Sequence, residues 1–277
     1  MRIGMVHFRV GDLDGVSLEM DKWRVVLERM GHKVSYLAGS VGQTDGYAVP
    51  ELSLNFEPAL LIQKNAFTEF TDFKTEDEFE SHITALTKQI QQKIQHYIDK
   101  FEIEFLIPNN MFGLPMNISA SLALFEVIKE NKLSGIALNH DFYWERKVYN
   151  PTVPLIQQYL DEFFPPKLSG IKHVVINSLA QKALEQKKGI QSSVVPNVFY
   201  FDEKPWEKDD FNCDLRERLN IDPSDIFVLH ATRIIRRKGI ELVIDLLEEL
   251  SKKENLRKLQ EKPLFDGRKF SQHNKYV

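Results

Sequence analysis

The sequence predicts an α/β fold built on a doubly wound parallel sheet. Short apolar runs alternate with segments of helical periodicity along most of the 277 residues, a pattern typical of parallel sheets covered by helices. The run Ile3–Phe8 opens the chain as a strand buried on both faces. A helix over Leu18–Met30 follows, with Gly31 as its C-terminal cap, and His32–Leu37 is the next strand. This strand–helix–strand unit has the length of a right-handed parallel crossover.

The clearest helix begins after Thr75, which opens a capping box with Glu78. Apolar side chains then recur at spacings of three and four on one face: Phe79, Ile83, Leu86, Ile90, Ile94 and Ile98. Between residues 41 and 73 the pattern is mixed, and only the apolar run Ala59–Ile62 stands out.

Strands and helices keep alternating up to about residue 200. The expected strands are Phe105–Pro108, Gly135–Leu138, Val174–Ile176 and an edge strand Ser193–Pro196, and the expected helices are Ser119–Glu130 and Leu179–Lys187. Because the first strand of a nucleotide-type fold is buried, we expect Ile3–Phe8 to be central in one sheet.

A polar, proline-containing stretch at residues 199–211 indicates a linker between two domains. After it come a short helix with Leu215 and Leu219, a strand Ile226–His230 and a helix Ile240–Leu250. We therefore predict a first domain over residues 1–200, and a linker with the start of a second Rossmann-like domain over residues 201–277.

The composition excludes several classes of protein. Hydrophobic residues make up 43% and charged residues 27%, which is ordinary for a globular protein, and the net charge of −4 gives no nucleic-acid-binding surface. The single cysteine, Cys213, allows no disulfide within the chain and suits a reducing compartment. No signal peptide or membrane-length apolar run is visible. We expect a cytoplasmic protein with no transmembrane segment; the sequence leaves its oligomeric state open.

In open parallel sheets, ligands bind beyond the carboxyl ends of the strands, so the loops there are the candidate sites. The first such loop is Gly11–Ser17. Gly15 permits close approach of the backbone, and the following helix offers free N–H groups to a phosphate, a carboxylate or a sugar hydroxyl. A plain turn is the alternative interpretation.

The loop Asn139–Arg146 follows a strand and holds a histidine, two carboxylates, an arginine and three aromatic rings. Such mixtures bind sugars, because aromatic faces cover C–H surfaces while charged groups take the hydroxyls. A structural histidine is the alternative. Asn177 and Ser178, which also follow a strand, are interpreted as helix caps.

The loop His230–Gly239 carries three arginines and a lysine between a strand and a helix. Cations backed by the N–H groups of a helix suit a diphosphate. A solvated basic turn is the alternative, but the position before a helix favours an anion site.

Taken in order, these loops resemble the retaining GT-B glycosyltransferases of family 4. The similar segments are Asp14–Ser17, as the glycine-rich loop; His140 with Asp141, as the active-site histidine; Thr232-Arg233 with Lys238–Leu242, as the donor-diphosphate segment; and Val195–Asn197, just before the linker. The resemblance runs from residue 1 to about residue 250. It implies two Rossmann-like domains, the first binding the acceptor and the second a nucleotide-diphospho-sugar.

The resemblance also implies roles for individual residues. Those with a catalytic role would be His140 and Asp141, those at the donor diphosphate Arg233, Lys238 and Gly15, and those at the acceptor Asp14, Val16, Ser17, Tyr143, Glu145 and Arg146. The activity would be transfer of a hexose to a hydroxyl of a small-molecule or glycan acceptor, with retention. No protein nucleophile, metal or other cofactor is required, because the leaving phosphate helps to deprotonate the acceptor.

The second domain departs from the family pattern. The family carries two glutamates seven residues apart that grip the donor, and its second domain continues for well over a hundred residues. Glu241 and Glu249 stand in the helix directly after Lys238, which is too early, and are interpreted as solvated helix charges. We therefore expect a shortened donor domain, and a non-catalytic protein that retains only the acceptor half is the alternative function. A dinucleotide-binding domain is disfavoured because the three-glycine fingerprint is missing.

Overall fold

The computed structural model describes residues 1–12, 15–199, 201, 204–205, 207–264, 267–271 and 276. The chain divides into two compact units, residues 1–199 and residues 200–277. Each unit is described by itself.

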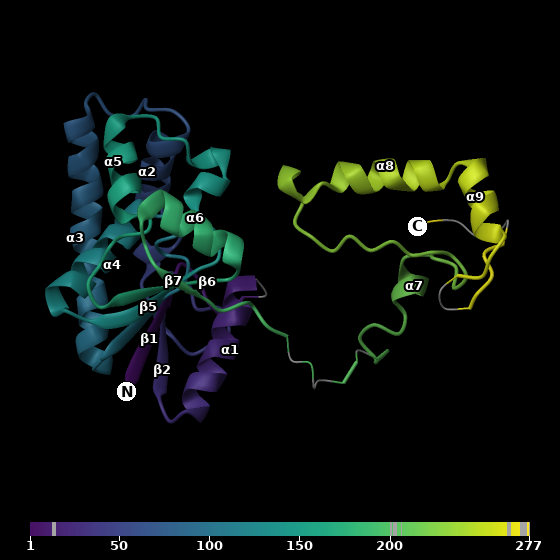
Figure 1. Ribbon diagram of the computed structural model, residues 1–277, viewed down its shortest axis with the longest axis horizontal. Helices are drawn as coiled ribbons and strands as arrows, with labels where there is room; N and C mark the ends of the chain where they lie inside the picture. The colour runs from purple at the N-terminus through teal and green to yellow at the C-terminus, as the bar shows by residue number, and fades with distance from the viewer. Residues whose placement is uncertain are drawn as a thin grey trace. The chain divides into compact units, whose positions relative to one another are not determined.

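The first unit is built on a parallel sheet of seven strands in the order β3-β2-β1-β4-β5-β6-β7 (Figure 1). The strands are β1 Arg2–His7, β2 Lys33–Ala38, β3 Tyr47–Ala48, β4 Phe105–Pro108, β5 Ser134–Asn139, β6 Ile171–Val175 and β7 Ser192–Val194. β1 pairs with β2 on one side and β4 on the other, so the prediction of a central first strand is confirmed. β7 is an edge strand, also as predicted.

Helices cover both faces of this sheet. They are α1 Gly15–Arg29, α2 Glu57–Phe67, α3 Glu76–Phe101, α4 Ile118–Asn131, α5 Pro154–Phe163 and α6 Ser178–Lys188. On one face Ile3 and Met5 of β1 pack with Met20 of α1. On the other, Val6 of β1 and Leu106 of β4 lie in the main core, which α3 and α4 help to form. Alternate residues of one strand therefore enter two cores, as a doubly wound sheet requires.

Three features of the sequence pattern are borne out in the first unit. Thr75 caps α3 by accepting a hydrogen bond from the backbone N–H of Glu78 at 3.2 Å. The Glu78 carboxylate accepts from the N–H of Lys74 at 2.9 Å, one residue before the cap, so the reciprocal bond of the predicted capping box is shifted by one residue. Asn177 likewise caps α6 through the N–H of Ala180 at 2.8 Å, so its interpretation as a cap is confirmed. Gly189 ends α6 in the left-handed conformation, with φ of 61°.

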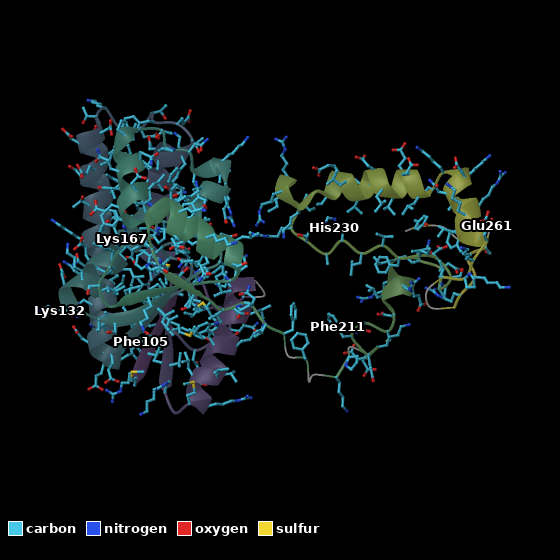
Figure 2. The ribbon with its side chains drawn as sticks, in the orientation of Figure 1. Phe105, Lys132, Lys167, Phe211, His230 and Glu261 are labelled. Atoms are coloured by element: carbon cyan, nitrogen blue, oxygen red, sulfur yellow. The ribbon has the colours of Figure 1, made fainter. Side chains whose placement is uncertain are left out.

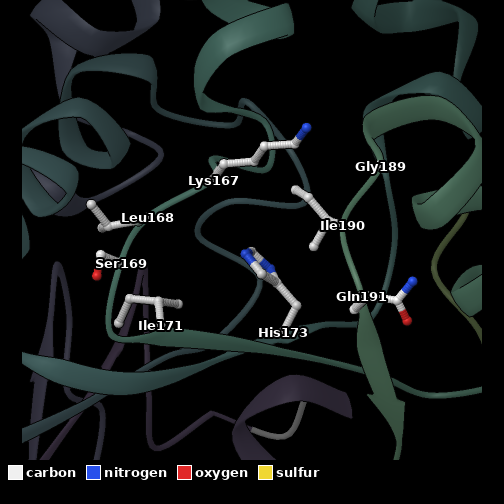
Figure 3. A pocket seen from close by; sticks show the side chains of 8 residues that line it. All are labelled: Lys167, Leu168, Ser169, Ile171, His173, Gly189, Ile190 and Gln191. Carbon is white, nitrogen blue, oxygen red and sulfur yellow. The ribbon is translucent and has the colours of Figure 1, made fainter.

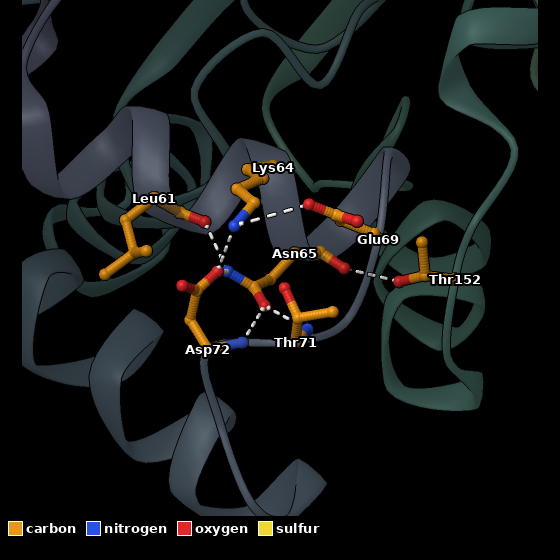
Figure 4. A network of polar contacts seen from close by, with 7 residues as sticks. All are labelled: Leu61, Lys64, Asn65, Glu69, Thr71, Asp72 and Thr152. Carbon is orange, nitrogen blue, oxygen red and sulfur yellow. Dashed lines mark hydrogen bonds and ion pairs between the residues drawn. The ribbon is translucent and has the colours of Figure 1, made fainter.

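The region that gave no clear pattern contains α2, which includes the apolar run Ala59–Ile62, and the short strand β3. Asn65 on α2 holds the loop that leads to α3 (Figure 4). Its buried amide oxygen accepts from the backbone N–H groups of Thr71 and Asp72, both at 3.0 Å. Its amide nitrogen donates to the carbonyl of Leu61 and the carboxylate of Asp72, both at 2.9 Å. The Thr152 hydroxyl donates to the Asn65 carbonyl, which ties this loop to the segment before α5.

The second unit contains α7 Leu215–Arg218, α8 Ile240–Leu250 and α9 Lys253–Gln260. The helix expected at Ile240–Leu250 is confirmed, but the strand expected at Ile226–His230 was wrong. Among the described residues of this segment, only Ile226 forms a bridge, with Tyr276. A strand needs neighbours to satisfy its backbone groups, and this apolar run does not have them here.

Apolar side chains of the second unit are widely exposed. Phe211 is 86% exposed (Figure 2), and on α8 the exposed fractions are 67% for Leu242, 61% for Ile244 and 51% for Leu246. The residues that share the apolar face of this helix, Ile240, Val243, Leu247 and Leu250, are partly buried, so the exposed apolar side chains flank that face.

Candidate active site

Three neighbouring strands of the first unit end in buried polar side chains. His7 ends β1, Asn109 directly follows β4 and Asn139 ends β5, and all three are at most 4% exposed. The Nδ1 atom of His7 lies 2.7 Å from the carbonyl oxygen of Asn109. Because a carbonyl only accepts, Nδ1 carries the proton. Three neighbouring strands thus end in buried hydrogen-bonding side chains at the carboxyl edge of the sheet.

Asn109 and Asn139 repeat one local arrangement on adjacent strands. Each side-chain nitrogen donates to the backbone carbonyl two residues earlier, Ile107 at 2.9 Å for the first and Ala137 at 3.0 Å for the second. Within the part of the chain that the structure describes, the Oδ1 atom of each has no hydrogen-bond partner. A buried acceptor without a partner costs free energy, so two of them side by side mark a place where a ligand or water completes the bonding.

His140 lies directly after Asn139, and the Nε2 atom of its ring is buried with no partner among the described residues. Burial lowers the pKa of His140, although the nearby carboxylates of Asp141 and Glu19 act to raise it. The ring is therefore neutral at neutral pH. Asn110, with φ of 52°, fixes the backbone here by accepting from the N–H groups of His140 and Asp141 at 3.2 and 3.3 Å.

Next in the loop, Asp141 is paired with Arg146, whose Nη2 lies 2.6 Å from Asp141 Oδ2. The carboxylate of Glu145 accepts from the backbone N–H of Phe142 at 3.0 Å and so closes its own short turn. The ring of Tyr143 is half-buried beneath the ammonium of Lys188, 5.5 Å from the ring centre. Glu145 and Tyr143 thus contact neighbouring groups of this chain. That they also bind the acceptor stays a prediction.

Helix α1 begins at the same edge of the sheet, since it follows β1. Space around Gly15 is open: a Cβ atom there would meet no atom within 4 Å. Val16 is partly buried against the core, Ser17 is only 2% exposed, and Asp14 lies outside the described residues. Gly15 therefore leaves the helix N-terminus accessible, while the side chains of the next two residues face inward.

Glu19, on the first turns of α1, is 4% exposed and pairs with Lys22 at 3.1 Å. Its carboxylate acts electrostatically on His140, so the first turns of α1 lie near the loop after β5. The expected proximity of Gly15 and His140 stays a prediction. Among the described residues, no group of three side chains could hold a metal ion, and no helix could cross a membrane.

Arg233 and Lys238 belong to the second unit and are both exposed. Lys238 ends the short 3-10 helix Arg236–Lys238, directly before α8, whose N-terminal residue follows Gly239 at φ of 61°. Two cations therefore precede the N-terminus of an eleven-residue helix, in the arrangement predicted for a diphosphate site.

No family model matches the chain. Two curated relatives match over 273 residues, or 98% of the chain: the mannosylglucosylglycerate synthase of Petrotoga mobilis at 41% identity and that of Thermotoga maritima at 37%. The chain spans 62% and 61% of the length of these relatives.

Two solved structures share the architecture at low identity. A sucrose-phosphate synthase from Thermosynechococcus elongatus matches 90% of this chain and 60% of its own, with a TM-score of 0.56 and 13% identity. A glycosyltransferase involved in lipopolysaccharide biosynthesis matches 88% of this chain and 58% of its own, with a TM-score of 0.52 and 11% identity. The chain has the GT-B glycosyltransferase fold. The predicted α/β class, with GT-B-like architecture, is thereby confirmed, and the homologues are enzymes named as synthases.

Within this GT-B framework, several residues at the carboxyl edge were not predicted from the sequence. Glu19 was not singled out, although spacings of three from Val16 and four to Trp23 place this carboxylate on the inward face of α1. A glutamate on an apolar helix face is a usable signal. Asn139 begins the predicted loop Asn139–Arg146 but received no role of its own, and Asn109 was not predicted at all, because an asparagine after a strand is usually a turn residue.

Proposed function

We propose that the protein to which this chain belongs transfers a mannosyl group from a nucleotide-diphospho-mannose to a hydroxyl of glucosylglycerate, with retention. The observation that carries the proposal is the 41% identity with a mannosylglucosylglycerate synthase over nearly the whole chain. The GT-B fold supports it, since glycosyltransferases share that fold. The unpartnered amide oxygens of Asn109 and Asn139 at the carboxyl edge are chemically suited to sugar hydroxyls.

In the proposed reaction, the bond between the sugar carbon and the diphosphate breaks, and a bond from that carbon to the acceptor oxygen forms on the same face. The proton of the acceptor hydroxyl passes to the leaving phosphate. Arg233 and Lys238 would offset the charge that develops on the diphosphate. His140, neutral because its ring is buried, would contact the donor sugar without attracting the phosphates.

The acceptor carries a carboxylate on its glycerate end, and this group calls for a cation. Among the predicted acceptor residues, Arg146 is the cation, and its pairing with Asp141 holds the guanidinium in one orientation. Asp141 would thus act by orienting Arg146. In this proposal Arg233 and Lys238 neutralise the diphosphate and Arg146 neutralises the carboxylate of the acceptor. No metal ion is therefore needed, and EDTA should leave the rate unchanged.

The test is an assay of the purified chain with nucleotide-diphospho-mannose, varied in its base, and glucosylglycerate. Mass spectrometry would detect the addition of one hexose, and the anomeric proton signal of the product would report retention. His140→Ala should abolish transfer, whereas His96→Ala, which removes an exposed histidine of α3, should not. Equal rates for these two variants would contradict the role of His140.

A second function, sugar binding without transfer, is favoured by one observation. Leu242, Ile244 and Leu246 of α8 are exposed, and the run after Ile226 forms no strand among the described residues, so the second unit packs loosely. Calorimetric binding of either sugar, with no hexose transfer over long incubation, would identify this function instead.

A further inference from the structure

The side-chain amide of Asn139 is held in one orientation by its neighbours. The residue is 1% exposed at the end of β5. Its Nδ2 atom lies 3.0 Å from the carbonyl oxygen of Ala137 and 3.3 Å from that of Val174. Carbonyl oxygens only accept hydrogen bonds, so the NH₂ end of the amide must lie on this side.

The same argument fixes the protonation of His173, on the neighbouring strand β6. Nδ1 of His173 faces Asn139 Nδ2 at 3.3 Å and must accept from it. Nε2, 3.0 Å from the carbonyl oxygen of Pro166, must then donate. Burial lowers the pKa of His173, which favours this neutral ring. Figure 3 shows the His173 ring directed toward the loop that carries Lys167.

Because the nitrogen end is fixed, the Oδ1 atom of Asn139 points the other way. It is one of the acceptors left without a partner among the described residues. Asn139 and His140 together line a cavity of about 10 Å³, which is room for one oxygen-sized group. The other lining residues are Trp23, Leu138, Val174, Val175, Ile176, Val195 and Asn197.

We propose that Asn139 Oδ1 is a buried acceptor for one hydroxyl group of a sugar substrate, and that His173 is the residue that positions it. This inference rests on the proposed function and adds a subsite to it. The hydroxyl donates its proton to Asn139 Oδ1 within the cavity. His173 touches no substrate and acts only through the amide of Asn139.

The chemistry of the lining selects a neutral hydroxyl over an anion. Among the residues that the structure describes, no carboxylate, ammonium or guanidinium lines the cavity. An amide oxygen repels phosphate and carboxylate groups. The indole of Trp23 and the surrounding valines suit the C–H surface of a sugar ring. The hydroxyl can come from the donor hexose or from the acceptor, and the experiment separates these two sources.

The first measurement is nitrogen NMR of the full 277-residue chain. We expect His173 to be neutral, with the proton on Nε2, and the Asn139 side-chain NH₂ to exchange slowly with solvent. We expect the Asn139 amide signal to shift when either nucleotide-diphospho-mannose or glucosylglycerate is added, and the ligand that moves it identifies the source of the hydroxyl. The nucleoside diphosphate without sugar should leave the signal in place.

The second measurement is calorimetry on paired variants. His173→Asn keeps an acceptor at the position of Nδ1 and should preserve sugar binding, whereas His173→Gln keeps the donor toward Pro166 but loses that acceptor. Loss of one hydrogen bond predicts about fivefold weaker binding of the sugar for His173→Gln. Asn139→Ala should weaken it by at least as much, while the matched control Asn131→Ala, at an exposed asparagine of α4, should not.

The outcomes separate this site from the proposed function. A sugar-dependent shift of Asn139 without hexose transfer would leave the site standing and remove the function. Hexose transfer with an unmoved Asn139 signal would support the proposed function and overturn the site, and would mean that the cavity holds only an ordered water. A proton on Nδ1 of His173, or equal binding by His173→Gln and His173→Asn, would also overturn the proposal.

Discussion

Replacing Asn65 by alanine should destabilise the first unit strongly, because this side chain is fully buried and makes four hydrogen bonds (Figure 4). At about 1 kcal/mol for each bond the loss is about 4 kcal/mol. The N–H groups of Thr71 and Asp72 lie in an exposed loop and can recover bonds to water, which reduces the expected loss to about 3 kcal/mol. In a unit of this size, that corresponds to a fall in Tm of about 6–12 °C.

The assay is urea unfolding followed by far-ultraviolet circular dichroism, with Tm measured in parallel. Asn131→Ala is the matched control, since its side chain also bonds a helix carbonyl but is exposed. It should cost less than about 1 kcal/mol. If Asn65→Ala and Asn131→Ala shifted the unfolding midpoint equally, the loop after α2 would not depend on the Asn65 amide, and the argument from buried hydrogen bonds would be wrong.

Three other perturbations have expected outcomes. Burial lowers the pKa of both His140 and His173, so the unfolded chain binds more protons than the folded chain does. Their contribution to stability should be complete above the unfolded pKa of about 6.5 and should be lost as the pH falls below it. A Tm that stays constant from pH 7.5 to 5.5 would contradict this. Gly113→Ala should lower the Tm, because a Cβ there would lie 2.2 Å from a backbone oxygen of the loop after β5; an unchanged Tm would show that this loop moves freely. Arg233→Ala and Lys238→Ala should each weaken binding of a nucleotide-sugar, because each removes an exposed cation that precedes the N-terminus of α8; calorimetry that gives unchanged affinity for both variants would contradict the diphosphate site.

Much of the fold could be predicted because its signals are local. The N-cap at Thr75, the left-handed glycine after α6 and the apolar run of β1 each act within a few residues, and each appears in the structure as expected. The strand expected at Ile226–His230 shows the limit of that reasoning. Its apolar pattern is genuine, but a strand also needs neighbours for its backbone, and no local pattern reports whether they are present.

The candidate site was predictable only in part. His140 drew attention because of the charged and aromatic residues around it, and the structure places it at the carboxyl edge, where its ring is buried. Asn139 became informative only through a contact with His173, thirty-four positions away in sequence. Contacts of that kind depend on how two strands align in the sheet, and a single sequence does not report that alignment.

The side chain of Asn139 is an uncharged amide, and this has a consequence for ionic strength. A hydroxyl held by Asn139 would carry no net charge, so salt should barely alter that interaction. A diphosphate held by the exposed Arg233 and Lys238 would be screened, since the Debye length falls from about 10 Å at 0.1 M salt to about 3 Å at 1 M. Raising the salt concentration should therefore weaken binding of the nucleoside diphosphate but leave the preference for one sugar over another unchanged. That result would assign affinity to residues of the second unit and sugar selectivity to residues of the first.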